Sequence, residues 1–198
     1  KQMKKLFTFA FAVLFITGIA SAQISFGLKA GLNVFTVKAE DYDNEEQKSK
    51  MGLAIGGIVN IPVNETFSVA PELFYSQEGT QWKGDDYTEL EPWNFLNIPI
   101  LAQYNDPSGF IAHTGPQVGL LLAAKEVWKE EGSRETYDIK DEFKSTNFSW
   151  VFGAGYRLKQ GFGVAARCTL GLSDMANDGG PKATSNGFHI GVFYMFHS

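Results

Sequence analysis

Eight polar side chains of this sequence could do chemistry, because each interrupts an otherwise small and apolar stretch. They are Lys29, Glu72, Gln103, His113, Gln117, Arg157, Arg167 and His189. A histidine beside a serine or an aspartate can activate a nucleophile in a hydrolase or an acyltransferase. Neither histidine here belongs to a nucleophile motif, so the sequence predicts no catalytic residue and no enzyme. The eight side chains are instead expected to form a polar network.

Metal and cofactor sites have little support in the sequence. It contains no Cys/His set, phosphate-cradling glycine loop or dinucleotide fingerprint, so no cofactor or metal is predicted. Two acidic clusters could bind calcium, but neither has the ligand spacing of a calcium loop. The alternative is two solvated loops. The clusters are Asp41, Asp43, Glu45 and Glu46, and Asp85, Asp86, Glu89 and Glu91.

The segments that must position these side chains are strands, and residues 147–172 show the pattern most clearly. Phe148, Trp150 and Phe152 alternate with Ser149, Val151 and Gly153, and residues 162–172 alternate in the same way. Side chains in a strand point to opposite faces with a period of two. Residues 159–161 supply the tight turn between them. The stretch is therefore a predicted β-hairpin.

The polar face of this hairpin decides which side is inside. A soluble barrel buries its apolar face, whereas a membrane barrel presents that face to lipid. Glycine, alanine, serine and an occasional arginine make a poor solvent-facing surface but suit a narrow lumen. The apolar face is therefore expected to face lipid.

The same alternation recurs along the chain and predicts eight strands of about ten residues, the length that a tilted membrane strand needs. The expected strands are residues 25–34, 51–61, 67–77, 95–104, 110–122, 147–158, 162–172 and 186–196. Long polar connections alternate with short turns, as in outer-membrane barrels, which have short periplasmic turns and long external loops. The predicted fold is all-β: an eight-stranded antiparallel up-and-down transmembrane barrel with a narrow, side-chain-filled lumen and both termini in the periplasm.

Two details of this prediction depend on residue type. Residues 79–92 and 123–143 are charged and lack periodicity, so both are expected to be loops, the second with a helical turn within residues 123–131. Pro71, Pro99 and Pro116 cannot donate a ladder hydrogen bond. They are therefore expected to mark bulges or locally poor pairing.

The first 22 residues have the composition of a secretory signal peptide. Lys1, Lys4 and Lys5 precede an apolar run from Leu6 to Ile19 and the small-residue sequence Ala20-Ser21-Ala22. The predicted domains are thus a signal peptide over residues 1–22 and a barrel over residues 23–198. Removing three lysines changes the net charge from −5 to −5 − 3 = −8, which disfavours nucleic acid as a partner.

Four strand segments resemble a known family. APELFYSQEG (70–79), FLNIPILAQY (95–104), HTGPQVGLLL (113–122) and FGAGYRL (152–158) are similar to strand motifs of the PorT-like outer-membrane barrels of Bacteroidota. The resemblance covers residues 24–196. It implies an eight-stranded barrel in the outer membrane, in a family of which some members are linked to protein secretion or gliding.

The charged lumen positions predict one specific contact. Lys29, Arg157 and Arg167 face a single acid, Glu72, and an unpaired buried carboxylate is costly. Counted from their turns, Glu72 and Arg167 lie at similar depth on strands four apart in a ring of eight. They are expected to pair across the lumen, with Lys29 as the next candidate, whereas Arg157 should lie near the periplasmic rim.

Two classes of function follow. The first is a structural, interaction or secretion-associated barrel, monomeric, surrounded by outer-membrane lipid and able to contact secretion or envelope proteins through its external loops. The alternative is a small porin or transporter for small or hydrophobic solutes. A filled eight-stranded interior favours the first, because it leaves no wide pore.

Overall fold

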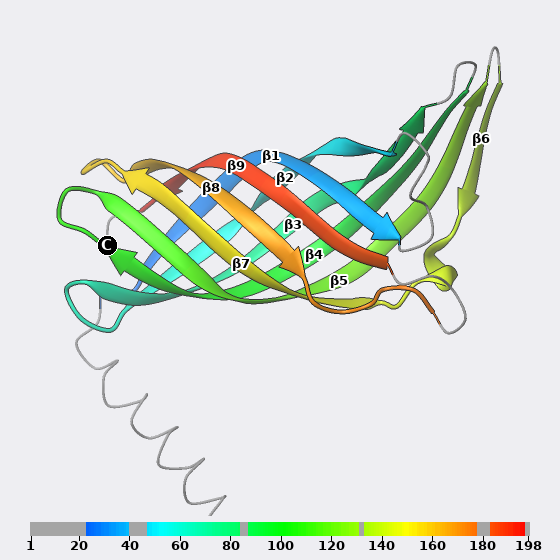
Figure 1. Ribbon diagram of the computed structural model, residues 1–198. Helices are drawn as coiled ribbons and strands as arrows, with labels where there is room; N and C mark the ends of the chain where they lie inside the picture. Colours follow the sequence, from blue (N-terminus) through cyan, green and yellow to red (C-terminus); the bar gives the residue numbers. More distant parts are fainter. Residues whose placement is uncertain (1–22, 40–46, 84–86, 131–132, 178–182, 197–198) are drawn as a thin grey trace, which may run out of the picture.

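The computed structural model describes residues 23–39, 47–83, 87–130, 133–177 and 183–196. These residues form nine strands and a short 3-10 turn, η2 (Figure 1). The bounds are β1 Ser25–Ala39, β2 Gln47–Pro62, β3 Phe67–Lys83, β4 Tyr87–Asn105, β5 Phe110–Glu130, β6 Ser133–Asp138, η2 Lys140–Glu142, β7 Thr146–Arg157, β8 Phe162–Gly171 and β9 Ala183–Met195.

Eight of these strands close a ring. All the pairings are antiparallel, and the order around the ring is β1, β2, β3, β4, β5, β7, β8, β9 and back to β1. Strand β6 stays outside the ring and pairs with the distal half of β5. The predicted eight-stranded antiparallel barrel is therefore confirmed.

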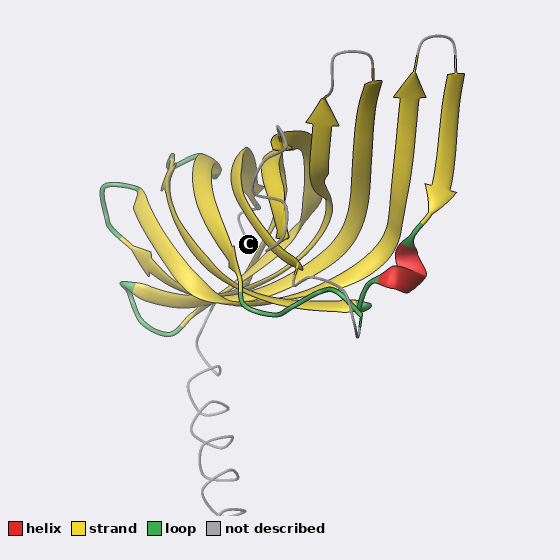
Figure 2. Cartoon of the chain, turned by 45° about the vertical axis from the view of Figure 1, so that its right-hand side comes forward, coloured by secondary structure: helices red, strands yellow, loops and turns green. Residues whose placement is uncertain are grey.

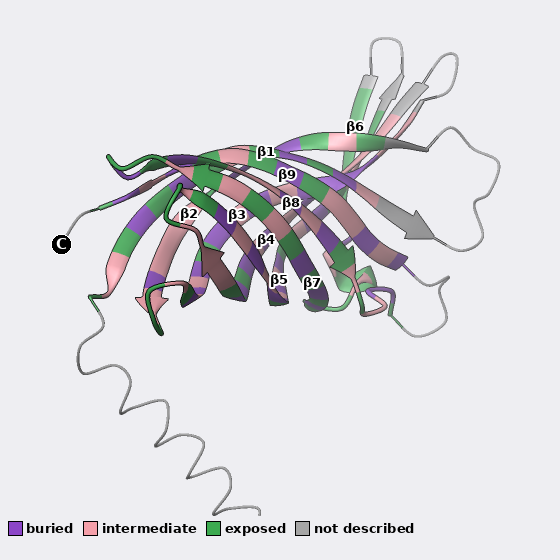
Figure 3. Cartoon of the chain, turned by 60° about the vertical axis from the view of Figure 1, so that its left-hand side comes forward, coloured by how far each residue is buried: buried purple, intermediate pink, exposed green. Residues whose placement is uncertain are grey.

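The period-two alternation separates an apolar exterior from a filled interior. On β1, Leu28 is 60% exposed, whereas its neighbour Lys29 is 4% exposed. The same change from exposed to buried residues recurs along the other strands (Figure 3). The in-and-out assignment derived from the hairpin holds around the whole ring.

The prediction of loops at residues 79–92 and 123–143 was wrong. Strand β3 runs on to Lys83 and β4 begins at Tyr87, while β5 continues through the predicted helical region to Glu130. The only helical turn between Ala123 and Phe143 in the described residues is η2. These segments leave the barrel, so neither face must be apolar, and the alternation that marks a membrane strand disappears.

The extended strands form a sheet that projects from one end of the barrel and bends away from it (Figure 2). Two register shifts lie near the start of this projection, one between β2 and β3 at Ser49/Ala54 and one between β4 and β5 at Asn94/Phe95. An extra residue in one strand bends it and increases its twist. The shifts therefore fit the change in direction.

The three prolines are not the sites of these bulges. The β3–β4 register is the same before and after Pro71, and Pro99 and Pro116 pair with Gln117 and Trp150. No bulge lies at these prolines, but ladder pairs are missing beside them, between Pro71/Ile100 and Phe74/Asn97 and between Pro99/Gln117 and Ala102/Thr114. The expected locally poor pairing is therefore confirmed, whereas the register shifts lie where the sheet leaves the barrel.

The predicted signal peptide, residues 1–22, and most of the acidic residues of the possible calcium loops lie outside the described residues. Within the described ranges, no helix has the length and apolar character to cross a membrane.

Candidate functional site: the charged cluster in the lumen

Glu72 lies at the centre of the lumen and binds two cations at once. Arg167 of β8 donates two parallel hydrogen bonds to it, Nη1 to Oε2 and Nη2 to Oε1, each 2.6 Å long. Lys29 of β1 donates from Nζ to Oε2 at 2.8 Å. All three side chains are at most 8% exposed. Arg167 is thus the partner expected from the sequence, and Lys29 joins the same carboxylate.

Small residues on the strands between them give these long side chains room. Gly56 of β2 stands between Lys29 and Phe74, and the Lys29 ammonium lies 3.9 Å from the centre of the Phe74 ring. Gly153 of β7 stands beside Arg167, where an added Cβ would come within 2.9 Å of the Arg167 Cγ. The glycines that alternate with apolar residues in the sequence therefore make space for the charged cluster.

The two histidines flank this cluster but do not join its hydrogen bonds. Both face the lumen as predicted, and they are 5% and 7% exposed. Across the described residues, neither the Nε2 of His113 nor either ring nitrogen of His189 has a hydrogen-bond partner, and the same is true of the Arg167 Nε. The expectation that the histidines are hydrogen-bonded therefore gains no support at these three ring nitrogens.

The three remaining predicted residues face the same lumen but lie outside the ion cluster. Gln103 donates to Asn105 Oδ1 at 2.8 Å, and Gln117 donates to Ser149 Oγ at 3.2 Å. Arg157 ends β7, close to its turn, as the sequence predicted. The structure therefore joins three of the eight predicted residues in one ion cluster and distributes the others around it.

A second buried carboxylate was missed. Glu78 is 2% exposed; its Oε1 accepts hydrogen bonds from Ser76 Oγ and Asn97 Nδ2, each at 2.9 Å, and its Oε2 accepts one from Ser185 Oγ at 3.1 Å. The predicted strand ended at Gln77, so Glu78 fell just outside it. The two-residue alternation of the strand identifies Glu78 as a lumen residue, because residues 72, 74, 76 and 78 share one face of β3.

The sequence matches a family model described as an outer membrane protein beta-barrel domain over residues 19–177. The chain belongs to this family. No curated protein matches the chain. The outer-membrane barrel expected from the sequence is therefore confirmed at the level of the family.

Solved structures support the same fold. Neisserial surface protein A, NspA, is 13% identical, with 86% of this chain and 97% of that chain covered and a TM-score of 0.53. Ail, the attachment invasion locus protein of Yersinia pestis, solved with the heparin analogue sucrose octasulfate, is 12% identical, with 87% and 99% covered and a TM-score of 0.50. At these identities the likeness shows the fold alone.

In an outer-membrane barrel the apolar exterior faces lipid. The interior of this one is closed in layers. Near the projecting sheet, Trp93, Phe95 and Met175 belong to a buried apolar cluster against which Phe143 packs. At the opposite end, Phe193 and Met195 form a second cluster with Ile111. The ion cluster lies between them, beside a cavity of only about 20 Å³ that has room for about one water molecule.

Proposed function

We propose that this outer-membrane barrel is a structural or interaction protein with a plugged lumen, whose projecting sheet contacts secretion or other envelope proteins. The observation that supports this most directly is the double engagement of Glu72 by Lys29 and Arg167. Strands β1, β3 and β8 are thereby connected through the interior rather than around the wall.

The plug is held by electrostatics and by packing together. An ion that passed through the lumen would have to displace Arg167 from a two-bond contact with Glu72, and losing one partner of a buried pair costs about 3–5 kcal/mol. The apolar clusters at both ends of the lumen would have to open as well. These features favour a closed barrel over a small porin or transporter.

The projecting sheet supports the interaction role. Strand β6 lies at its edge (Figure 1). Arg134 to Asp138 are exposed on both of its faces. Tyr137 is 51% exposed and Trp128 of β5 is 39% exposed, and aromatic residues are enriched in protein interfaces. The four strand motifs that resemble PorT-like barrels add secretion as the first process in which to look for a partner.

Planar-bilayer recording tests the plug. The purified barrel should show no steady open level in salt solution, because the ion cluster and two apolar clusters close its lumen. A Thr136→Ala variant, altered only on exposed β6, serves as the matched control and should be equally silent. A steady open level in the unaltered barrel would reject the plugged barrel and favour the porin or transporter.

Orientation is part of the proposal, with both termini and the short turns in the periplasm. A Cys168→Ala background carrying either Ser108→Cys, in the β4–β5 turn, or Thr136→Cys, on β6, can be treated with a membrane-impermeant maleimide. Intact cells should label only the β6 cysteine. Labelling of only the turn cysteine would reverse the orientation.

A further inference from the structure

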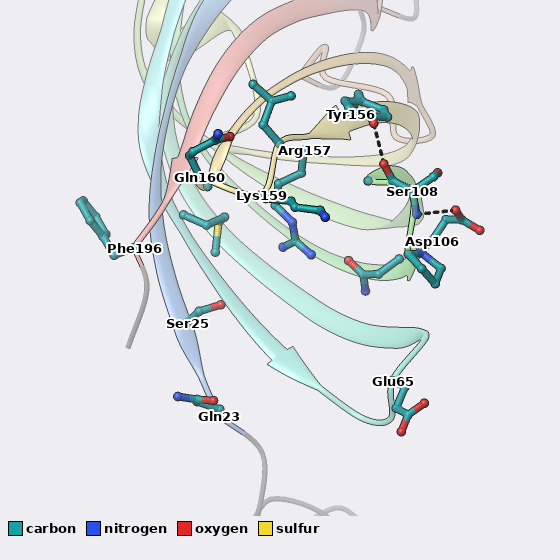
Figure 4. A pocket seen from close by; sticks show the side chains of 16 residues that line it. Gln23, Ser25, Glu65, Asp106, Ser108, Tyr156, Arg157, Lys159, Gln160 and Phe196 are labelled. Carbon is teal, nitrogen blue, oxygen red and sulfur yellow. Dashed lines mark hydrogen bonds between the residues drawn. The ribbon is translucent and has the colours of Figure 1, made fainter.

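The end of the lumen that carries the short turns opens into a cavity of about 800 Å³ (Figure 4). Its walls come from the β4–β5 and β7–β8 turns and from the ends of β1 and β9. Met195 lines both this cavity and the smaller one beside Glu72, so it marks the boundary between the open mouth and the closed lumen. The mouth has the volume of a small-molecule site.

Arg157 places a positively charged guanidinium in this mouth. It is half-buried, it lines both cavities, and its side chain points into the mouth beside Lys159 (Figure 4). Its backbone N–H is fixed by a 2.8 Å hydrogen bond to the Gly109 carbonyl. In the part of the chain that the structure describes, no side chain accepts a hydrogen bond from its guanidinium.

The carboxylates around the mouth do not neutralise Arg157. Asp106 accepts a hydrogen bond from the Ser108 backbone N–H at 2.9 Å and one from the Tyr104 hydroxyl at 3.2 Å. The hydrogen bonds from Ser108 hold the pKa of Asp106 below its usual range, so it stays ionised where it is. Glu65 is exposed on the β2–β3 turn and lies apart from Arg157 (Figure 4).

A half-buried guanidinium without an acceptor is uncommon, because partly desolvated charges are normally paired. Its planar donors fit a carboxylate or a phosphate with two parallel hydrogen bonds. Asn105 and Gln160 line the same mouth and can hydrogen-bond a polar ligand beside that group. We propose that this mouth binds a small polar ligand through an oxyanion, a carboxylate or a phosphate, with Arg157 as its anchor.

The test uses the mature chain in uncharged maltoside micelles at low salt, with dansyl-glycyl-alanine as the probe and its C-terminal amide as the matched control. Dansyl fluorescence should report binding of the free acid. The affinity of the amide should be at least about tenfold lower, because a hydrogen bond to a charged group is lost. Equal binding of the acid and the amide would overturn the proposal.

Two variants locate the site. Arg157→Gln should weaken binding of the free acid by about tenfold or more. Arg134→Gln removes the same charge from exposed β6 and should bind as the unaltered barrel does. Heat-modifiable migration on gels checks that both variants are folded. Undiminished binding by folded Arg157→Gln would contradict the proposal, and if that variant does not fold, the comparison of acid with amide decides alone.

Competition distinguishes the two sources of the oxyanion. Displacement of the probe by acetate but not by inorganic phosphate assigns a carboxylate ligand, and the reverse assigns a phosphate ligand. Either result supports an oxyanion site. Both anions are tested only at concentrations at which the barrel, including the Arg134→Gln control, stays folded. If neither anion displaces the probe under these conditions, the proposal is overturned.

Discussion

Glu72 and Glu78 lie six residues apart on β3, both face the lumen and both are almost fully buried. Glu72 is held by two cations from β1 and β8. Glu78 is held by two hydroxyls and an amide, all neutral. One strand thus stabilises two buried carboxylates in different ways. Cations neutralise Glu72 in the middle of the barrel, whereas neutral donors hydrogen-bond Glu78 near the projecting sheet. The two sites should respond differently to the same kind of substitution.

The largest effect is expected from Glu72→Ala, which leaves both Lys29 and Arg167 buried without an anion. The free energy of unfolding should fall by about 3–5 kcal/mol. Urea titration of the barrel in phospholipid vesicles measures it. Arg167→Met leaves a neutral Lys29–Glu72 pair and should cost less, and removing all three charges should recover most of the loss. If Arg167→Met is as damaging as Glu72→Ala, the account of the cluster is wrong.

A charge on the lipid face has neither counter-charge nor neutral donors available. Ile55→Arg, on the exterior of β2 and in the middle of that strand, should reduce the free energy of unfolding by about 2–4 kcal/mol. The same titration measures it, with Thr136→Arg on exposed β6 as the control. Equal tolerance of the two substitutions would mean that the exterior does not face lipid.

Glu78→Gln should have a much smaller effect than Glu72→Gln. A glutamine of the same shape keeps hydrogen-bonding capacity, since Ser76 and Ser185 can reorient their hydroxyls to accept. The expected loss is about 1 kcal/mol or less, against about 3 kcal/mol for Glu72→Gln. Both variants can be compared in one denaturant series. A loss at Glu78 equal to that at Glu72 would remove the distinction between the two sites.

The smallest effect is a pH dependence that comes from a third carboxylate, Glu91. Glu91 lies in the projecting sheet, because the paired ring of strands ends near Leu96. Burial, and then the charges of Glu89, Glu126 and Glu142, raise the pKa of Glu91 to about 8. When the β3–β4 hairpin around Glu91 is unfolded, the carboxyl group loses its proton near the ordinary glutamate pKa. When the hairpin is folded, the carboxyl group keeps the proton until about pH 8. The stability of the hairpin should therefore fall as pH rises from about 4.5 to 8.

Hydrogen exchange of the β4 amides near Glu91 measures this fall, compared at each pH with Glu91→Gln. The variant removes the titrating group, so its protection relative to the unaltered chain should increase as the pH rises. A difference between the two proteins that does not change with pH would contradict the assignment.

The sequence predicted the ring and its ion pair because lipid on one side and a crowded lumen on the other impose strict alternation. Depth counted from the turns was then enough to bring Glu72 and Arg167 together. The same reasoning missed Glu78 because the predicted strand ended one residue too early. It failed in the projecting sheet because no regular alternation of apolar and polar residues marks those strands. It placed the histidines in the lumen but did not identify their hydrogen-bond partners, because a face assignment fixes only the direction of a side chain.

The position of the ion cluster also bears on how the barrel assembles. In an open, flat sheet β3 and β8 would be four strand spacings apart, about 19 Å, which is too far for Glu72 and Arg167 to meet. They are also 95 residues apart in the chain, so their contact requires distant parts of the chain to come together. In a half-closed sheet Lys29 can still reach Glu72 across β2, but Arg167 has no carboxylate to bind. Its unpaired charge resists entry into lipid, and closing the cylinder removes that barrier to insertion.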